Sequence, residues 1–211
     1  MDITPLFVAS GIGFSHAFEA DHLVAVSNIV TRRNNVFLAL KDGIFWGLGH
    51  TSTILLVGSI FIVGKFVFDE NLFQYLEACV GLMLIFLGGF RLYRFYKNDH
   101  FLQNHTHSHE GTHEHKLAYS VGLIHGLAGS GALILSILTT IKGSLNGILY
   151  LIIFGLGSVA GMMLAAGVFS VPFSQKLMNN STLRLILTIL SSLLCIGLGC
   201  FVVYKNLQNG I

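Results

Sequence analysis

Four ionisable side chains lie within seven residues of one apolar stretch: His16, Glu19, Asp21 and His22. Placing a single Asp at the centre of a membrane helix costs about 2.5–3.5 kcal/mol on insertion scales, so such a cluster indicates an ion pathway or a binding site rather than packing. Imidazole and carboxylate together suit divalent transition metals such as Ni²⁺, Co²⁺, Zn²⁺ and Mn²⁺ better than alkali ions. The residue types therefore predict a transition-metal site.

The spacing of these four residues conflicts with a regular helix. At about 100° per residue, His16, Glu19 and His22 span an arc of about 120°, whereas Asp21 lies nearly opposite Glu19. A continuous helix cannot direct all four side chains at one ion. Either the helix is unwound here, as transporter helices often are, or Asp21 serves a neighbouring helix. The glycines just before the cluster would tolerate a break.

Other apolar stretches supply further candidates. His50 lies in GLGHTST and His125 in GLIHGLAGSG, among small residues that let helix backbones approach closely. Either histidine could complete a coordination shell or hold a ligand in place, although a lone buried histidine is more often a hydrogen-bonded core residue. Asn28 could orient a ligand or make a hydrogen bond between helices.

The composition indicates that the chain lies in lipid and not in water. Only 10% of its 211 residues are charged, against about 25% in soluble domains, and 53% are hydrophobic. These values exclude a soluble globular protein and a disordered chain. The net charge of +2 gives no field that would bind nucleic acid. We predict an all-α, polytopic membrane protein that contacts the lipid bilayer and carries no prosthetic group.

Stretches of about 20 apolar residues are long enough to span a bilayer. Six are predicted, at 4–30, 36–64, 71–96, 117–141, 145–171 and 183–205. The start of the sequence has no basic segment of the signal-peptide kind, so the first stretch is expected to be a spanning helix.

The two halves of the chain resemble each other. Gly13 and His16 recur 109 residues later as Gly122 and His125. We therefore divide the chain into a first three-helix repeat at 1–97, a linker at 98–116 and a second repeat at 117–211. Because three is an odd number of spans, the repeats would be inverted, as in many transporters. The alternative is that apolar helices rich in Gly and Leu match by chance.

The linker is rich in histidine, which predicts weak, multidentate metal binding without the fixed spacing of a structural zinc site; a merely solvated linker is the alternative. Its candidate ligands are His105, His107, His109, His113 and His115. Of the twelve basic residues, nine lie on the side of the linker. The positive-inside rule therefore places the linker in the cytoplasm and both termini outside, in a membrane we take to be the bacterial plasma membrane.

These motifs resemble those of a known family. HAFEADH at 16–22 fits the HX4DH signature of the nickel/cobalt transporter (NiCoT) superfamily, and FWGLGHTSTI at 45–54 resembles its second signature. GLIHGLAGSGAL at 122–133 is similar to the urease-accessory nickel permeases of the same superfamily. The resemblance implies a secondary transporter of Ni²⁺ or Co²⁺ in which His16, Asp21 and His22 are essential and His50 contributes.

The sequence thus predicts a permease, not an enzyme. Ni²⁺ would be the first candidate cargo, Co²⁺ the second, and Zn²⁺ or Mn²⁺ less favoured. The ion would bind near the membrane midplane at His16, Asp21 and His22, assisted by Glu19 and His50, and alternating access would come from rocking of the two halves. A cytoplasmic metallochaperone is a candidate partner. Two alternatives stay open: a membrane-embedded metalloenzyme, and a metal sensor or chaperone that works through the linker.

Overall fold

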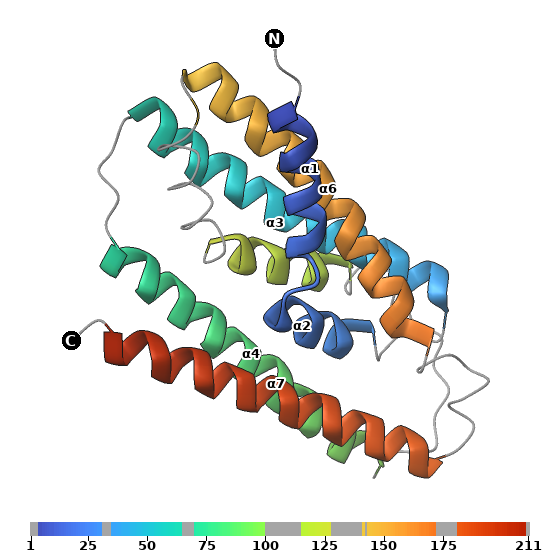
Figure 1. Ribbon diagram of the computed structural model, residues 1–211. Helices are drawn as coiled ribbons and strands as arrows, with labels where there is room; N and C mark the ends of the chain where they lie inside the picture. The colour runs from blue at the N-terminus through green and yellow to red at the C-terminus, as the bar shows by residue number, and fades with distance from the viewer. Residues whose placement is uncertain are drawn as a thin grey trace.

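Seven helices and no strand make up the part of the chain that the computed structural model describes (Figure 1). The described residues are 4–30, 35–64, 70–99, 115–127, 141, 143–171 and 181–209. The helices are α1 (Thr4–His16), α2 (Ala20–Val30), α3 (Val36–Gly64), α4 (Glu70–Asp99), a helix over residues 115–127, α6 (Ser144–Ser170) and α7 (Ser181–Asn209). The all-α prediction is confirmed.

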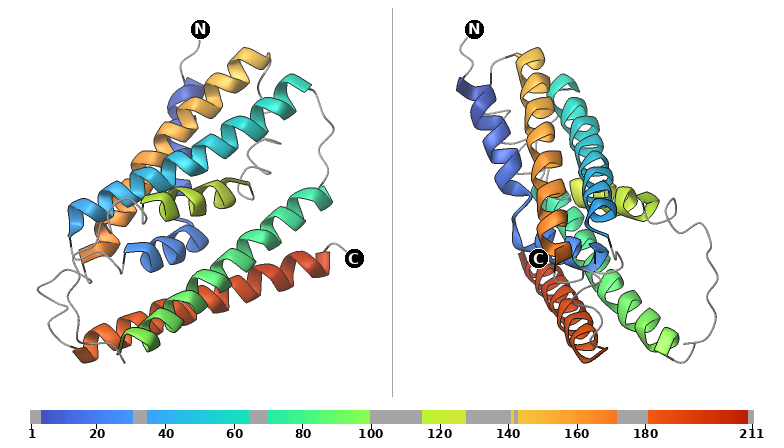
Figure 2. Two further views of the ribbon diagram at one scale, coloured as in Figure 1. Left: turned by 180° about the vertical axis from the view of Figure 1, so that it is seen from behind. Right: turned by 90° about the vertical axis from the view of Figure 1, so that its right-hand side faces the viewer.

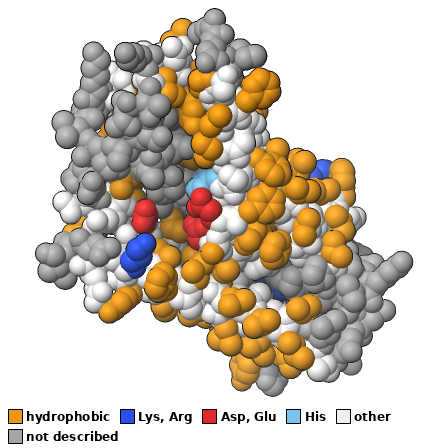
Figure 3. Space-filling model, in the orientation of Figure 1, with side chains coloured by type: hydrophobic (Ala, Val, Ile, Leu, Met, Phe, Trp, Pro, Cys, Tyr) orange, Lys and Arg blue, Asp and Glu red, His pale blue; other side chains and the backbone are white. Residues whose placement is uncertain are grey.

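Four of the described helices are long and apolar enough to cross a membrane, namely Val36–Gly64, Asn71–Lys97, Ser144–Ser170 and Leu185–Gln208. Their outward faces carry large apolar side chains, among them Leu56 and Phe86, which are more than half exposed. In Figure 3 hydrophobic side chains cover much of the visible face, which is the surface expected of a protein solvated by lipid. The chain is an integral membrane protein.

The long helices pack as two pairs. α3 packs along α6, and α4 packs along α7. α1 lies against α6, while α2 contacts α6, α7, α4 and α3 and so bridges the two pairs. Figures 1 and 2 show α2 and the helix over 115–127 between these pairs. α2 and the helix over 115–127 thus lie between long helices, and His22, Asn28 and His125 on them are buried.

Glycines bring the helix over 115–127 against α3 backbone to backbone. A Cβ atom added at Gly126 would lie 2.5 Å from the carbonyl oxygen of His50, and one added at Gly122 would collide with the carbonyl oxygen of Trp46. Only glycine permits an approach this close. The contact places His50 beside the helix that carries His125, as the small residues around both histidines predicted.

The first apolar stretch is broken rather than continuous. α1 ends at His16 and α2 begins at Ala20, and the chain changes direction between them (Figure 1). The backbone N–H of Glu19 donates to the carbonyl of His16 at 3.1 Å in a tight turn, and the carbonyl of Glu19 then accepts the N–H of Leu23 at 2.9 Å to start α2. This confirms the unwound alternative that the spacing of the cluster suggested.

The break also bears on the number of spans. α1 has 13 residues and α2 has 11, each shorter than the about 20 that a span requires. Residues 117–127 of the predicted span at 117–141 belong to the helix over 115–127, and residues 128–140 lie outside the described residues. Six spans, the inverted repeats and the three-part division of the chain therefore stay predictions. The bounds predicted for the other four spans agree with α3, α4, α6 and α7 to within a few residues.

Candidate metal centre

The break between α1 and α2 brings two histidines of the cluster together. His16 is the last residue of α1 and His22 lies in the first turn of α2, and their ring centroids are 4.5 Å apart. The His22 side chain is fully buried, and that of His16 is 11% exposed. A regular helix would hold these rings more than one turn apart, so the break is what converts the sequence motif into a site.

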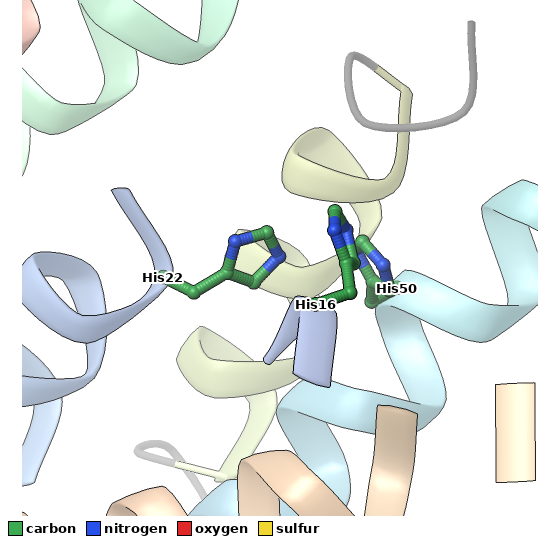
Figure 4. Close-up of side chains that lie close together, drawn as sticks. All are labelled: His16, His22 and His50. Atoms are coloured by element: carbon green, nitrogen blue, oxygen red, sulfur yellow. The ribbon is translucent and has the colours of Figure 1, made fainter. Parts of the chain in front are cut away.

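His50 joins the pair from α3. Its ring centroid lies 5.3 Å from that of His16 and 5.2 Å from that of His22, and the side chain is fully buried. Figure 4 shows the three rings facing one another, with one nitrogen of His22 directed toward the other two. One ligand atom from each residue lies within 4.8 Å of the others, which is close enough to hold a metal ion.

Each histidine of the motif has its own carboxylate. The Nδ1 atom of His16 lies 2.8 Å from Oε1 of Glu19, and Nδ1 of His22 lies 3.1 Å from Oδ1 of Asp21. A carboxylate accepts, so both rings donate from Nδ1 and carry their lone pair on Nε2. A carboxylate behind a histidine fixes the ring and raises its basicity in many metal sites. Glu19 and Asp21 thus hold the rings of His16 and His22 in place.

The nitrogens that these contacts leave over have no partner. Nε2 of His16, Nε2 of His22 and both nitrogens of His50 are buried without a hydrogen bond among the described residues. A buried polar atom without a partner costs about 1–3 kcal/mol. Four such atoms in one place call for an explanation, and a metal ion bound by one lone pair from each ring accounts for three of them.

His125 enters the site from the helix over 115–127. It is 1% exposed, and its Nε2 atom lies 2.9 Å from Oδ2 of Asp21, whose other oxygen accepts from His22. Asp21 therefore serves a neighbouring helix as well as His22, so both alternatives raised by the spacing hold. Asp21, His22 and His125 form a second group of possible ligands, again within 4.8 Å of one another.

Asn28 lies apart from both histidine groups. It is buried on α2, and its side-chain amide donates to the carbonyl oxygen of Ser191 on α7 at 3.3 Å. This is the hydrogen bond between helices that the sequence offered as an alternative to a ligand role. Of the predicted loop histidines, His105, His107, His109 and His113 lie outside the described residues.

The remaining loop histidine revealed a residue that the sequence analysis missed. His115 begins the helix over 115–127, and its Nδ1 atom lies 2.6 Å from Oδ1 of Asp42, a carboxylate on α3 that is only 1% exposed. The ring of Phe45 stacks on His115. An Asp inside a predicted span was the available signal. It was overlooked because no histidine stands beside Asp42 in the sequence.

The charges suit a divalent cation. Neutral imidazole rings supply the ligands at His16, His22 and His50. The carboxylates of Glu19 and Asp21 accept hydrogen bonds from two of these rings and add negative charge close to the ion. The carboxylates offset the charge of an ion in a poorly solvating interior. Figure 3 shows acidic side chains next to a histidine on a face that also carries large hydrophobic areas.

Fold and site together define an integral membrane protein with a buried cluster of histidines and carboxylates suited to a divalent transition metal. The chain is 34% identical over 176 residues to the urease accessory protein UreH of Bacillus sp. (strain TB-90), a match that covers 77% of this chain and 75% of that protein. The chain belongs to the UreH family of urease accessory proteins.

The other comparisons add no further relationship. No family model matches the chain, and no solved structure gives a significant match. The relative confirms the resemblance to urease accessory proteins, while the nickel permease activity and membership of the wider nickel/cobalt transporter superfamily stay predictions. The relative is named as an accessory protein and not as an enzyme, in agreement with the prediction that this chain is not an enzyme.

Proposed function

We propose that the chain is a membrane permease that carries a divalent transition-metal ion through the site formed by His16, His22 and His50. The observation that carries this proposal is the set of buried, unpartnered imidazole nitrogens, converging from α1, α2 and α3. Glu19 and Asp21 act from behind the rings, and the ion takes the lone pairs of the nitrogens that face one another.

Ni²⁺ is the first candidate cargo and Co²⁺ the second. Imidazole suits both ions, whereas Mn²⁺ prefers oxygen ligands. The resemblance to nickel/cobalt transporters and the kinship with a urease accessory protein favour Ni²⁺ over Zn²⁺. The metal is cargo, and we propose no prosthetic group.

The position of the site suits a carrier. It lies where a membrane helix is interrupted, between helices of both halves of the chain, and transporters commonly bind their substrates at such breaks near the midplane. Rocking of the halves about the site would expose it alternately to the two sides. The sequence has no GxxxxGK[ST] motif, so a gradient or a partner protein such as a metallochaperone would supply the energy.

The orientation completes the proposal. The excess of basic residues on the linker side supports a cytoplasmic linker with both termini outside, and the membrane we propose is the bacterial plasma membrane. The histidines of the linker would then meet the ion on the cytoplasmic side.

Accumulation of radioactive Ni²⁺ by cells that produce the full-length chain tests this function. We expect cells with the unchanged chain to accumulate Ni²⁺ above background, and His22→Ala to abolish the accumulation because it removes the ring that both groups share. Ser52→Ala is the matched control: Ser52 lies on α3 near His50, but its exposed hydroxyl only donates to the carbonyl of Leu48. Equal accumulation by all three chains and by empty cells would refute the proposal.

A further inference from the structure

His22 belongs to both groups of possible metal ligands. One group consists of His16, His22 and His50, and the other of Asp21, His22 and His125. The ring of His22 lies between them: its centroid is 4.1 Å from that of His125 and 4.5 Å from that of His16. The rings of His50 and His125 are farther apart, with centroids at 6.4 Å.

The two nitrogens of the shared ring have different surroundings. Nδ1 of His22 lies 3.1 Å from Oδ1 of Asp21, whereas its Nε2 is buried and has no partner among the described residues. Figure 4 shows one ring nitrogen of His22 directed toward His16 and His50 and the other directed away. The two nitrogens of an imidazole point outward in the ring plane in different directions, so one ion cannot bind both.

We propose that the cargo ion occupies two successive positions, one on each side of the His22 ring. The first position uses His16, Nε2 of His22 and His50, and the second uses Asp21, Nδ1 of His22 and His125. This inference rests on the proposed function and refines it: a divalent transition-metal ion passes between the two positions, and His22 is a ligand in each of them, through a different nitrogen.

The two positions differ in ligand chemistry. The first offers three imidazole nitrogens, and the second offers two nitrogens and a carboxylate oxygen. An ion in the second position replaces the hydrogen bonds that Asp21 now accepts from His22 and His125. Each ring keeps one proton, which moves to its other nitrogen, so the protein's charge does not change. Because two existing hydrogen bonds are lost, the second position binds more weakly than the first.

A weaker neighbouring position gives the ion a way to leave a tight site. Conduction requires binding that is favourable enough to admit an ion but divided among several positions so that the ion is released. Here the step also carries the ion from ligands of the first half of the chain to His125 in the second half. The second half would therefore take a direct part in transport and not serve only as a scaffold.

Co²⁺ added to the purified full-length protein in detergent is the probe, because its visible absorption bands depend on the number of nitrogen and oxygen ligands. We expect His125→Ala to keep the wild-type spectrum and to slow Co²⁺ flux in proteoliposomes. We expect His50→Ala still to bind Co²⁺, about tenfold or more weakly and with a changed spectrum, since the second position takes over. The double variant of His50 and His125 should lose binding.

A further variant distinguishes the loss of the His125 ligand from misfolding of the protein. His125→Gln keeps a donor for Asp21 while removing the imidazole, and it should behave as His125→Ala does. If His125→Ala changes the Co²⁺ spectrum as much as His50→Ala does, all the residues surround one ion and the inference is wrong. If the double variant binds as well as His50→Ala alone, the second position does not exist. Failure of the wild type to bind any Co²⁺ would instead overturn the proposed function itself.

Discussion

Replacing Gly13 with alanine should weaken metal binding without changing a single ligand. Gly13 lies where α1 crosses α6, and the hydroxyl of Ser158 donates to its carbonyl at 3.0 Å. A Cβ atom at Gly13 would lie 2.8 Å from the carbonyl carbon of Phe154 and closer still to its oxygen. Carbon atoms in ordinary contact are about 3.5–4.0 Å apart, so α1 must move away from α6 by about 1 Å.

That shift moves His16, which lies three residues further along α1 with its ring 5.7 Å from that of Phe154. Metal–ligand distances tolerate only about 0.2 Å of deviation. A displaced His16 can no longer share an ion with His22 and His50. We therefore expect the Ni²⁺ affinity to fall by about 10–100-fold, the range seen when a change in the surroundings misplaces a ligand.

Equilibrium dialysis of the purified protein against radioactive Ni²⁺ measures this change, with circular dichroism and size-exclusion chromatography to confirm folding. Gly11→Ala is the matched control, because a Cβ atom at Gly11 meets nothing within 4 Å. Wild-type affinity in a folded Gly13→Ala protein would refute the reasoning. An equal loss in Gly11→Ala would show that the substitution acts by something other than this contact.

Three further predictions concern other parts of the structure. Asp21→Asn should lower the Ni²⁺ affinity by about 10–100-fold in the same dialysis assay, because an amide cannot accept a hydrogen bond from both of the histidines that the carboxylate holds; unchanged affinity would contradict this role. His115→Ala should lower the free energy of unfolding by about 1–3 kcal/mol, since it removes a partner of a buried carboxylate, whereas the exposed neighbour Lys116→Ala should not; thermal unfolding followed by fluorescence distinguishes them. Gly199→Ala should lower the unfolding temperature because its Cβ would lie 2.6 Å from a carbonyl oxygen of α4, while Gly197→Ala has open space and should not; equal temperatures for the two would argue against close packing of α4 and α7.

The long helices could be predicted from the sequence because a membrane fixes their length. An apolar stretch must supply enough residues to cross the hydrocarbon core, and its ends must reach polar surroundings. The stretch at 36–64 coincides with α3, and 145–171 differs from α6 by a single residue at each end. The first stretch, 4–30, is long enough for one span but is divided into two helices, and its length and overall apolarity carried no signal of that division.

The break itself was foreseeable from the chemistry. The angular positions of His16, Glu19, Asp21 and His22 on a regular helix were incompatible with one site, and the structure resolves the conflict by ending α1 at His16. The distribution of roles was not foreseeable. Sequence spacing cannot show whether a carboxylate binds the ion itself or instead fixes a histidine ring by accepting a hydrogen bond from it. The distinction depends on the side-chain rotamers and on which nitrogen of each ring stays available for the ion.

The contacts between helices were the part of the structure that the sequence predicted least well. Asp21 meets His125, 104 residues away, and Asp42 meets His115, 73 residues away. The register between two packed helices is set by glycines that permit close approach, as at Gly126, and a single sequence does not state which glycine faces which helix. The predicted site consequently did not include His125, which the sequence offered only as a possible further ligand, and Asp42 was missed.

The most direct test of the central claim is metal flux into proteoliposomes that contain only the purified chain. Entry of Ni²⁺ or Co²⁺ would be compared for the wild type, His22→Ala and Ser52→Ala, with equal amounts of reconstituted protein. The account predicts flux for the wild type and for Ser52→Ala, and none above protein-free vesicles for His22→Ala. Flux that is the same with and without the His22 imidazole, or no flux from a folded wild-type protein, would contradict it.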